Sequence, residues 1–363
     1  MSKIVISGYY GFNNLGDESI LTAIISNLKD RIEGVEITVL SQEPKFTISK
    51  HHVHAIDRRN VFKIIDEIRK SDLLISGGGS LLQDVTSFRS IIYYLGVIGI
   101  GILLNKKVMI YSQGMGPINR PINRWFTKLV LDKVDYITLR DHKSENLLKE
   151  INVINENIII TADPVIGLKK ADIELGREIL IKAGIKDLSK PTICFALRGR
   201  DKTQNTINVI SKVTDRIINE MDVNVVFIPF HLGEDINILD DIEKKIENKA
   251  VFLRDKYNVE EMLSIIGNLD LLIGIRLHSL IFGAVMNIPL TAISYDPKIN
   301  NFMEFIEELV YCHINDLEEE GLFNEIKDKL VKEEEYKLEL HNKVNELKKR
   351  LSINEDIILR LLQ

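Results

Sequence analysis

The sequence predicts an α/β protein made of two parallel-sheet domains, and two observations lead to this fold class. Apolar runs typical of strands alternate with helical patterns along most of the chain, which favours parallel sheets with right-handed crossover helices. In addition, a helical pattern after Asn60 leads twelve residues later to Asp72 and a Leu-Leu-Ile run, and the same pattern follows Asn258 up to Asp270. One helix-then-strand unit used twice indicates two similar domains.

The expected elements are set by this alternation. In the first half, strands are expected at 3–8, 35–40, 73–76, 108–112, 135–139 and 158–160, and helices at 17–31, 60–70, 80–104, 121–133 and 142–150. In the second half, strands are expected at 192–197, 224–229, 271–273 and 288–293, and helices at 205–221, at 234–247 and after Asn258. Since 363 residues suffice for two domains, we assign residues 1–166 to the first, 167–315 to the second and 316–363 to a helical extension.

Composition and charge narrow the class of protein. A formal net charge of −6 with 45% hydrophobic residues is ordinary for a soluble globular protein and argues against nucleic acid as a partner. Cys194 and Cys312 have no CxxC spacing, and the chain opens into a strand without a signal peptide. We therefore expect a cytoplasmic protein, working at the inner face of the membrane if its substrate is lipid-borne.

The apolar segment from Ile91 to Leu104 needs a separate interpretation. It is shorter than the ~20 residues of a membrane span, and it contains Gly96, Gly99 and Gly101. We interpret it as a helix buried against a sheet. The alternative is a shallow, peripheral contact with a membrane.

Three charged or titrating side chains come after two apolar strands of the second domain. Arg276 and His278 come directly after the strand at 271–273, and Lys298 follows the strand at 288–293. Ligands of parallel α/β sheets bind at the carboxyl ends of the strands, so these residues are expected at one edge. Two cations and a histidine suit an anionic substrate that needs proton transfer. The alternative is a surface arginine and a hydrogen-bonded structural histidine.

The first strand ends in a glycine-containing loop that matches neither common nucleotide motif. The spacing fails the dinucleotide fingerprint, and the Walker pattern meets Asp17 where its lysine belongs. Asp17 and Glu18 suit the positive end of the following helix, and Asn13 and Asn14 can hydrogen-bond a neutral polyol. The alternative for Asp17 is a simple helix cap.

Two more glycine loops come after strands of the first domain, at 77–79 and at 113–117. Glycines there allow either close approach of the backbone to a ligand or tight packing of helix on strand. Arg140 ends a further strand, where Asp141 is a possible partner. Together these loops predict a mostly neutral wall. The second domain adds basic side chains at its own strand ends, namely Arg198, Arg200 and His231.

Over about its first 310 residues the sequence resembles the polysaccharide pyruvyl transferases, particularly the bacterial cell-wall (CsaB) type. The resemblance rests on these motifs: Gly11-Phe12-Asn13-Asn14-Leu15-Gly16-Asp17-Glu18, Gly77-Gly78-Gly79, Gln113-Gly114-Met115-Gly116-Pro117, Leu139-Arg140-Asp141, Gly274-Ile275-Arg276-Leu277-His278 and Asp296-Pro297-Lys298. It implies a fold similar to the GT-B glycosyltransferases, with two Rossmann-like domains facing a central cleft and C-terminal helices.

The resemblance also implies an activity. Pyruvate from phosphoenolpyruvate would be transferred to a sugar diol as a ketal, typically at the 4- and 6-hydroxyls of N-acetylmannosamine in a lipid-linked disaccharide precursor, with release of phosphate. Phosphoenolpyruvate would be a co-substrate, and no cofactor or metal is expected. Runner-up functions are a glycosyltransferase of the same architecture that uses a nucleotide sugar, and a non-catalytic binder of a sugar polymer or phosphorylated metabolite.

The expected site residues come from the resemblance and from the loops. The resemblance places phosphoenolpyruvate at Arg140, Arg276, His278 and Lys298, with His278 and Arg276 catalytic. His278 could be the acid that protonates C3 or the base for a sugar hydroxyl. The neutral wall is expected to bind the acceptor through Asn13, Asn14, Gly16, Asp17, Gly77, Gly78, Gly79 and Gln113.

Overall fold

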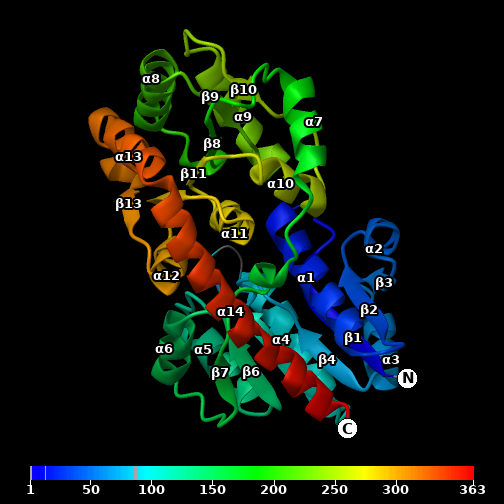
Figure 1. Cartoon of the computed structure of the whole chain (residues 1–363). Coiled ribbons are helices and arrows are strands. Elements are labelled where there is room, and N and C mark those ends of the chain that lie inside the picture. The colour runs from blue at the N-terminus through cyan, green and yellow to red at the C-terminus, as the bar shows by residue number, and fades with distance from the viewer. Residues whose placement is uncertain (1, 13, 86–87) are drawn as a thin grey trace. The chain divides into compact units, whose positions relative to one another are not determined.

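A computed structural model describes residues 2–12, 14–85 and 88–363. Its backbone separates into two compact units (Figure 1), the first made of Met1–Gly167 with Leu347–Gln363 and the second of Leu168–Glu346. Each unit contains one parallel sheet with helices packed on it. The predicted class of two parallel-sheet α/β domains is therefore confirmed.

Within the described residues, the sheet of the first unit has seven parallel strands in the order β3-β2-β1-β4-β5-β6-β7. The order reverses between β1 and β4, so the carboxyl ends of these strands form a topological switch point. The strands are β1 (Lys3–Tyr10), β2 (Glu36–Ser41), β3 (His54–Asp57), β4 (Leu73–Ser76), β5 (Lys107–Gln113), β6 (Tyr136–Leu139) and β7 (Ile158–Ile160). The helices are α1 (Leu15–Arg31), α2 (Pro44–His51), α3 (Val61–Lys70), α4 (Phe88–Leu103), α5 (Pro121–Leu131) and α6 (His142–Glu150), with a 3₁₀ turn η1 (Pro164–Gly167).

The sheet of the second unit has six parallel strands among the described residues, in the order β10-β9-β8-β11-β12-β13. Its switch point lies between β8 and β11. The strands are β8 (Thr192–Ala196), β9 (Asn224–Phe227), β10 (Val251–Phe252), β11 (Leu271–Gly274), β12 (Leu290–Ser294) and β13 (Val310–His313). The helical elements are α7 (Ile173–Ala183), η2 (Gly199–Asp201), α8 (Gln204–Met221), α9 (Leu232–Glu243), α10 (Val259–Ile266), α11 (Leu277–Met286), α12 (Pro297–Phe305), η3 (Ile314–Asp316) and α13 (Glu319–Val331).

The repeat seen in the sequence corresponds to the same helix cap and the same strand contact in both units. Asn60 and Asn258 are the N-cap residues of α3 and α10, and each side chain accepts a hydrogen bond from a backbone amide of the first turn. Asp72 accepts a hydrogen bond from the amide of Lys3 at the start of β1 (2.8 Å), and Asp270 accepts one from Thr192 at the start of β8 (2.7 Å). Each Asp therefore ties the start of its own strand to the start of the central neighbouring strand.

The helix predicted at 80–104 is wrong at its beginning, because α4 starts only at Phe88. The reason is Asp84, whose carboxylate accepts hydrogen bonds from the amides of Asn119 and Arg120 and from the Asn123 side chain. These bonds hold the loop between β4 and α4 against the loop between β5 and α5. The interpretation of the apolar segment as a buried helix is confirmed, since Ile91, Leu95 and Ile98 lie in the core of the first unit. Among the described residues, no helix is long and apolar enough to cross a membrane.

The chain ends in one long helix, α14 (Glu333–Leu361), whose residues from Leu347 onward group with the first unit. The Asn354 side chain accepts from Thr138 (2.6 Å) and donates to Ser112 (3.0 Å). Glu355 accepts from the Tyr111 hydroxyl at 3.1 Å. Burial raises the pKa of Glu355 above its ordinary value. The predicted C-terminal helices are thus present, and the last turns are fixed to β5 and β6 by polar contacts.

Candidate functional site

The carboxyl edge of the second sheet brings together the three residues that the sequence singles out there. Arg276 is the N-cap residue of α11, directly after β11, and His278 lies in the first turn of that helix. Lys298 lies in the first turn of α12, directly after β12. Since β11 and β12 are paired neighbours, the ends of adjacent strands carry all three side chains.

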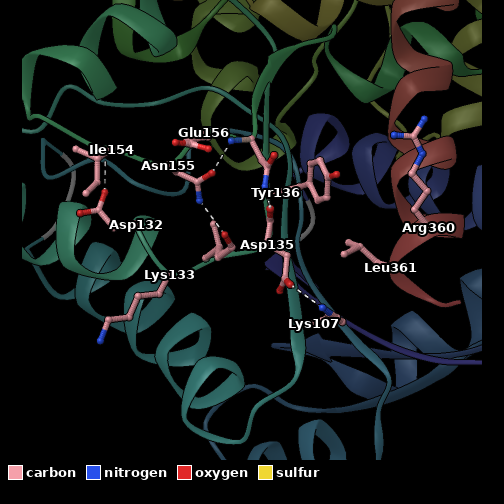
Figure 2. A pocket seen from close by; sticks show the side chains of 12 residues that line it. Lys107, Asp132, Lys133, Asp135, Tyr136, Ile154, Asn155, Glu156, Arg360 and Leu361 are labelled. Atoms are coloured by element: carbon pink, nitrogen blue, oxygen red, sulfur yellow. Dashed lines mark hydrogen bonds and ion pairs between the residues drawn. The ribbon is translucent and has the colours of Figure 1, made fainter.

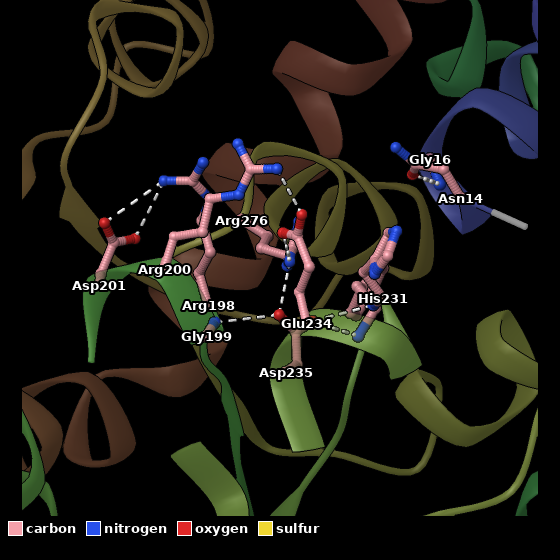
Figure 3. A network of polar contacts seen from close by, with 11 residues as sticks. Asn14, Gly16, Arg198, Gly199, Arg200, Asp201, His231, Glu234, Asp235 and Arg276 are labelled. Carbon is pink, nitrogen blue, oxygen red and sulfur yellow. Dashed lines mark hydrogen bonds and ion pairs between the residues drawn. The ribbon is translucent and has the colours of Figure 1, made fainter. Parts of the chain in front are cut away.

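Arg276 is held by two carboxylates at the N-terminus of α9 (Figure 3). Its Nη2 donates to Asp235 at 2.5 Å and to Glu234 at 3.2 Å. Burial works against the charged guanidinium, but Asp235 and Glu234 outweigh it and raise the pKa of Arg276. Within the described part of the chain, its Nε is buried and has no hydrogen-bond partner. The guanidinium is therefore charged, fixed at one end, and left with an unused donor.

Asp235 is the fixed point of this network. It is fully buried, and besides Arg276 it accepts hydrogen bonds from the amides of Gly199 (3.1 Å), Phe230 (3.1 Å) and His231 (2.8 Å). A Cβ on Gly199 would lie 1.7 Å from the carbonyl oxygen of Glu234, so only glycine fits there. The loop after β8 is thus pressed onto the start of α9, and this packing orients Asp235.

Sequence reasoning missed Asp235 and Glu234. Acidic residues are common in the first turn of a helix because they complement its dipole, and Glu234 and Asp235 occupy that position in α9. Nothing in their spacing distinguishes a buried clamp from a solvated surface charge. The one available signal is the Leu197-Arg198-Gly199-Arg200 loop, whose glycine indicates close backbone packing.

A second cluster at this edge forms around the Tyr295 ring. The Arg198 guanidinium lies 4.1 Å and the Lys298 ammonium 5.3 Å from the ring centroid. Arg198 also pairs with Asp201 at 3.3 Å, and Lys298 with Asp296 at 3.4 Å. Burial raises the pKa of Asp201, although Arg198, Arg276 and Lys298 all act to lower it. The three cations are thus close enough to act on one carboxylate.

In the first unit, Arg140 is buried at the carboxyl end of β6 and joins several loops. Its Nη1 donates to Asp163 at 3.0 Å and its Nη2 to Ser80 at 3.0 Å. Asp141 lies 3.6 Å from Nε, so the pairing considered from the sequence is present but Asp163 is closer. A Cβ on Gly114 would lie 2.6 Å from Arg140 Nε. The guanidinium therefore lies directly against the glycine loop after β5.

The loop between β1 and α1 is fixed by hydrogen bonds to residues of the first unit. Asn14 is the N-cap residue of α1, and its side chain accepts from the amide of Gly16 at 3.1 Å. Asp17 lies in the first turn rather than at the cap, and its Oδ1 is 3.4 Å from the Cβ position of Gly79. Glu18 is buried and accepts from the Gly11 amide at 2.8 Å. Asn13 lies outside the described residues.

The glycines at 77–79 are explained by packing and by backbone conformation. A Cβ on Gly77 would meet the Tyr10 hydroxyl at 2.1 Å, and Gly79 has a φ of +91°. Gln113 is buried, and its amide donates to Ser76 (2.7 Å) and to the carbonyl of Gly77 (2.8 Å). These contacts shape the switch point of the first sheet. The assignment of these residues to acceptor binding stays a prediction.

A cavity of about 620 Å³ lies at the other edge of the first sheet, beside the amino ends of β5, β6 and β7 (Figure 2). Several of the polar groups that line it are engaged in ion pairs and hydrogen bonds within the protein. Asp135 pairs with Lys107 at 3.1 Å, and the Asn155 amide donates to the carbonyls of Leu131 and Val134. Ligand sites in such sheets are found at the carboxyl edge, so this cavity is not the candidate site.

Comparison with solved structures identifies the fold. MnaA from S. aureus, solved with UDP, aligns with a TM-score of 0.69 at 12% identity over 99% of this chain and 98% of that one. HepE from Anabaena, solved with UDP and glucose, aligns with 0.66 at 12% identity over 99% of each chain. A glycosyltransferase from Rickettsia africae aligns with 0.67 at 13% identity over 100% of this chain and 99% of that one. The chain thus has the fold of the GT-B glycosyltransferases and the epimerases that resemble them.

The family of the protein is shown by comparison of its sequence with family profiles. A profile described as polysaccharide pyruvyl transferase matches residues 14–297, so the chain belongs to the polysaccharide pyruvyl transferase family and is a transferase of polysaccharide biosynthesis. The amylovoran biosynthesis protein AmsJ from Erwinia amylovora is 21% identical over 354 residues, 82% of this chain and 84% of that protein. The matched range includes Arg140, Arg276 and His278 and ends one residue before Lys298.

Proposed function

We propose that this protein transfers pyruvate from phosphoenolpyruvate to a sugar diol as a cyclic ketal and releases phosphate. The proposed acceptor is N-acetylmannosamine, modified at its 4- and 6-hydroxyls, in a lipid-linked precursor of a cell-wall polymer, as in the cell-wall type of the family. The observation that carries the proposal is the edge of the second sheet, where a clamped arginine, a histidine and a lysine come directly after adjacent strands.

The reaction needs three proton transfers, one onto C3 and one from each sugar hydroxyl, and a leaving phosphate. A proton added to C3 of the enol creates an oxocarbenium-like centre at C2, which one sugar hydroxyl attacks while it loses its own proton. Phosphate then leaves from C2, and the second hydroxyl closes the ring and loses its proton in turn. His278 serves as the acid for C3 or as the base for a hydroxyl, a role typically worth ~10²–10⁴ in rate.

The basic residues of this edge fall into two groups. One arginine keeps its carboxylate partners, and the others can exchange theirs for the substrate. At the second sheet's edge, Arg198, Arg200, Arg276 and Lys298 face Glu234, Asp235, Asp201 and Asp296, so the edge is close to neutral without substrate. An anionic substrate must therefore draw cations away from these carboxylates. Lys298 and Arg198 hold their partners at 3.4 and 3.3 Å, whereas Arg276 is bound to the buried Asp235 at 2.5 Å.

This difference supports the following proposed roles. Lys298 and Arg198 turn to the carboxylate or the phosphate of phosphoenolpyruvate, and Arg276 remains clamped and offers its unused Nε donor. Such fixed donors help catalysis where charge builds toward the transition state. Arg140 of the first unit is proposed as a further phosphoenolpyruvate ligand, released from Asp163 or Ser80 when the anion binds.

A product assay tests the proposal. The purified protein is incubated with phosphoenolpyruvate and a panel of synthetic hexosamine glycosides, with and without free 4- and 6-hydroxyls, and inorganic phosphate is measured. Phosphate release that requires both hydroxyls, with a product heavier by one pyruvate minus water, is expected. Release of a nucleotide from UDP-sugars instead would identify a glycosyltransferase, and saturable binding without turnover would identify a binding protein.

A further inference from the structure

Three neighbouring helices of the first unit leave large apolar side chains exposed. Helix α4 contacts both α3 and α5 (Figure 1), and all three contribute to the same core layer. Monomeric proteins rarely expose many large apolar side chains together unless they bind something. The exposed residues are Val61 and Phe62 on α3, Val85 before α4, Ile92 and Leu103 on α4, and Ile122, Trp125, Phe126 and Leu129 on α5.

Helix α5 is oriented opposite to an ordinary surface helix. Its large apolar residues at 122, 125, 126 and 129 follow the spacing of one helical face, and that face is exposed. The residues it buries are Asn123, Thr127 and Leu131. Trp125 is 56% exposed and packs edge-on against Phe126, with ring centroids 4.8 Å apart. Since the core uses the more polar face, the aromatic face is available to a partner.

The neighbouring surface of α4 is smooth. A Cβ added at Gly96 or Gly99 would meet no atom within 4 Å, so these positions open to solvent. By contrast, a Cβ on Gly101 would lie 2.7 Å from Leu74 in the sheet. Only Gly101 is needed for packing inside the unit. The other two glycines leave a low surface beside Ile92 that does not obstruct approach to α5.

Charge identifies the kind of partner. Residues 85–131, which build α4, β5 and α5, contain six basic residues and no acidic one, in a chain whose net charge is −6. Several of the six pair with acidic residues outside this range, as Arg124 does with Glu150 and Lys128 with Asp132. An apolar face with basic side chains and an aromatic anchor matches an anionic lipid surface. A second copy of this chain would bring two like-charged faces together.

We propose that the first unit docks on an anionic membrane surface through α4 and α5, with Trp125 and Phe126 at the lipid interface. This inference rests on the proposed function, because a lipid-linked acceptor has to be reached at a membrane. In parallel α/β units the helices begin near the carboxyl ends of the strands, and Phe62, Ile92 and Ile122 lie in the first two turns of their helices. These three residues of the exposed patch therefore lie toward the edge that carries the glycine loops.

The experiment uses Trp125, the only tryptophan of the chain, as its probe. The full-length protein is mixed with vesicles of phosphatidylglycerol and phosphatidylcholine, or of phosphatidylcholine alone, and emission and co-sedimentation are measured. A blue shift and sedimentation with the anionic vesicles are expected, and both should weaken at high salt because screening shortens the reach of the basic residues. Phe126→Ser with Leu129→Ser should weaken vesicle binding about tenfold or more.

The matched control is Ile48→Ser, which changes an exposed apolar residue of the same unit, 43% exposed, on α2 rather than on the three helices. It should bind vesicles like the wild type, and circular dichroism should show that both variants are folded.

Two results would overturn the docking surface. One is the absence of a vesicle-dependent emission shift. The other is an emission shift that depends only on protein concentration and is accompanied by the mass of a dimer. Vesicle binding without phosphate release from any acceptor would overturn the proposed function and leave the docking surface standing. Transfer to a water-soluble glycoside without vesicle binding would do the reverse.

Discussion

The two copies of the repeated unit, α3 with β4 and α10 with β11, share a scaffold and differ in the loop that comes after the strand. In both, an asparagine caps the helix and an aspartate fixes the start of the central neighbouring strand. After the strand, the first copy continues with three glycines at 77–79, and the second with Arg276 and His278. The scaffold decides where the loop begins. The loop of the first copy presents mainly backbone atoms, whereas the loop of the second copy carries an arginine and a histidine.

Removing His278 should have the largest effect, because it takes away the proposed proton-transfer group of the second copy. His278→Ala is expected to lower the rate of phosphate release ~10²–10⁴-fold without unfolding the protein. His341→Ala, which changes an exposed histidine of α14, is the control and should leave the rate unchanged. Turnover close to that of the wild type in His278→Ala would reject the catalytic role.

Asp235→Asn should have the next largest effect, because it removes the buried charge that clamps Arg276. Breaking one side of a buried ion pair costs about 3–5 kcal/mol, and the loss should appear as a lower midpoint of urea unfolding together with slower turnover. Asp296→Asn alters the half-exposed pair with Lys298, which is worth about 1 kcal/mol or less. Equal losses in the two variants would mean that Asp235 is not a special anchor.

Phosphoenolpyruvate affinity provides a third comparison, between a basic residue of each unit. Lys298→Ala and Arg140→Ala are each expected to raise KM for phosphoenolpyruvate roughly 10–100-fold, the loss of one or two charge-assisted hydrogen bonds. Because Arg140 is buried, Arg140→Lys serves as the variant that keeps the charge and changes the geometry. Lys202→Ala, which alters a pair with Asp241, is the control. Unchanged KM in both alanine variants would contradict the assignment of these residues.

The sequence was sufficient for features that depend on local patterns. The central strands of both sheets are continuous apolar runs, and β4 and β11 lie where the repeat predicts them. Short or half-buried edge strands such as β3, β10 and β13 were missed, because a few residues of mixed polarity carry little periodicity. The late start of α4 and the burial of Asp235 depend on hydrogen bonds between distant loops, which no local pattern records.

The smallest expected effect concerns the shared aspartates and has a definite sign. Asp270 is partly buried, and burial raises its pKa above the ordinary 3.8, with Glu333 adding to the shift. The folded state therefore binds the proton more tightly than the unfolded state, so this group's contribution to stability falls as pH rises from 3.8 through the raised pKa. Asp270→Asn can still accept the Thr192 amide hydrogen bond and carries no charge. It should gain stability relative to the wild type, by about 1 kcal/mol or less, as the pH of the urea unfolding is raised from about 3 to about 7. Asp72→Asn, at the exposed counterpart, controls for the change of acceptor, and an equal gain there would show that burial of Asp270 is not the cause.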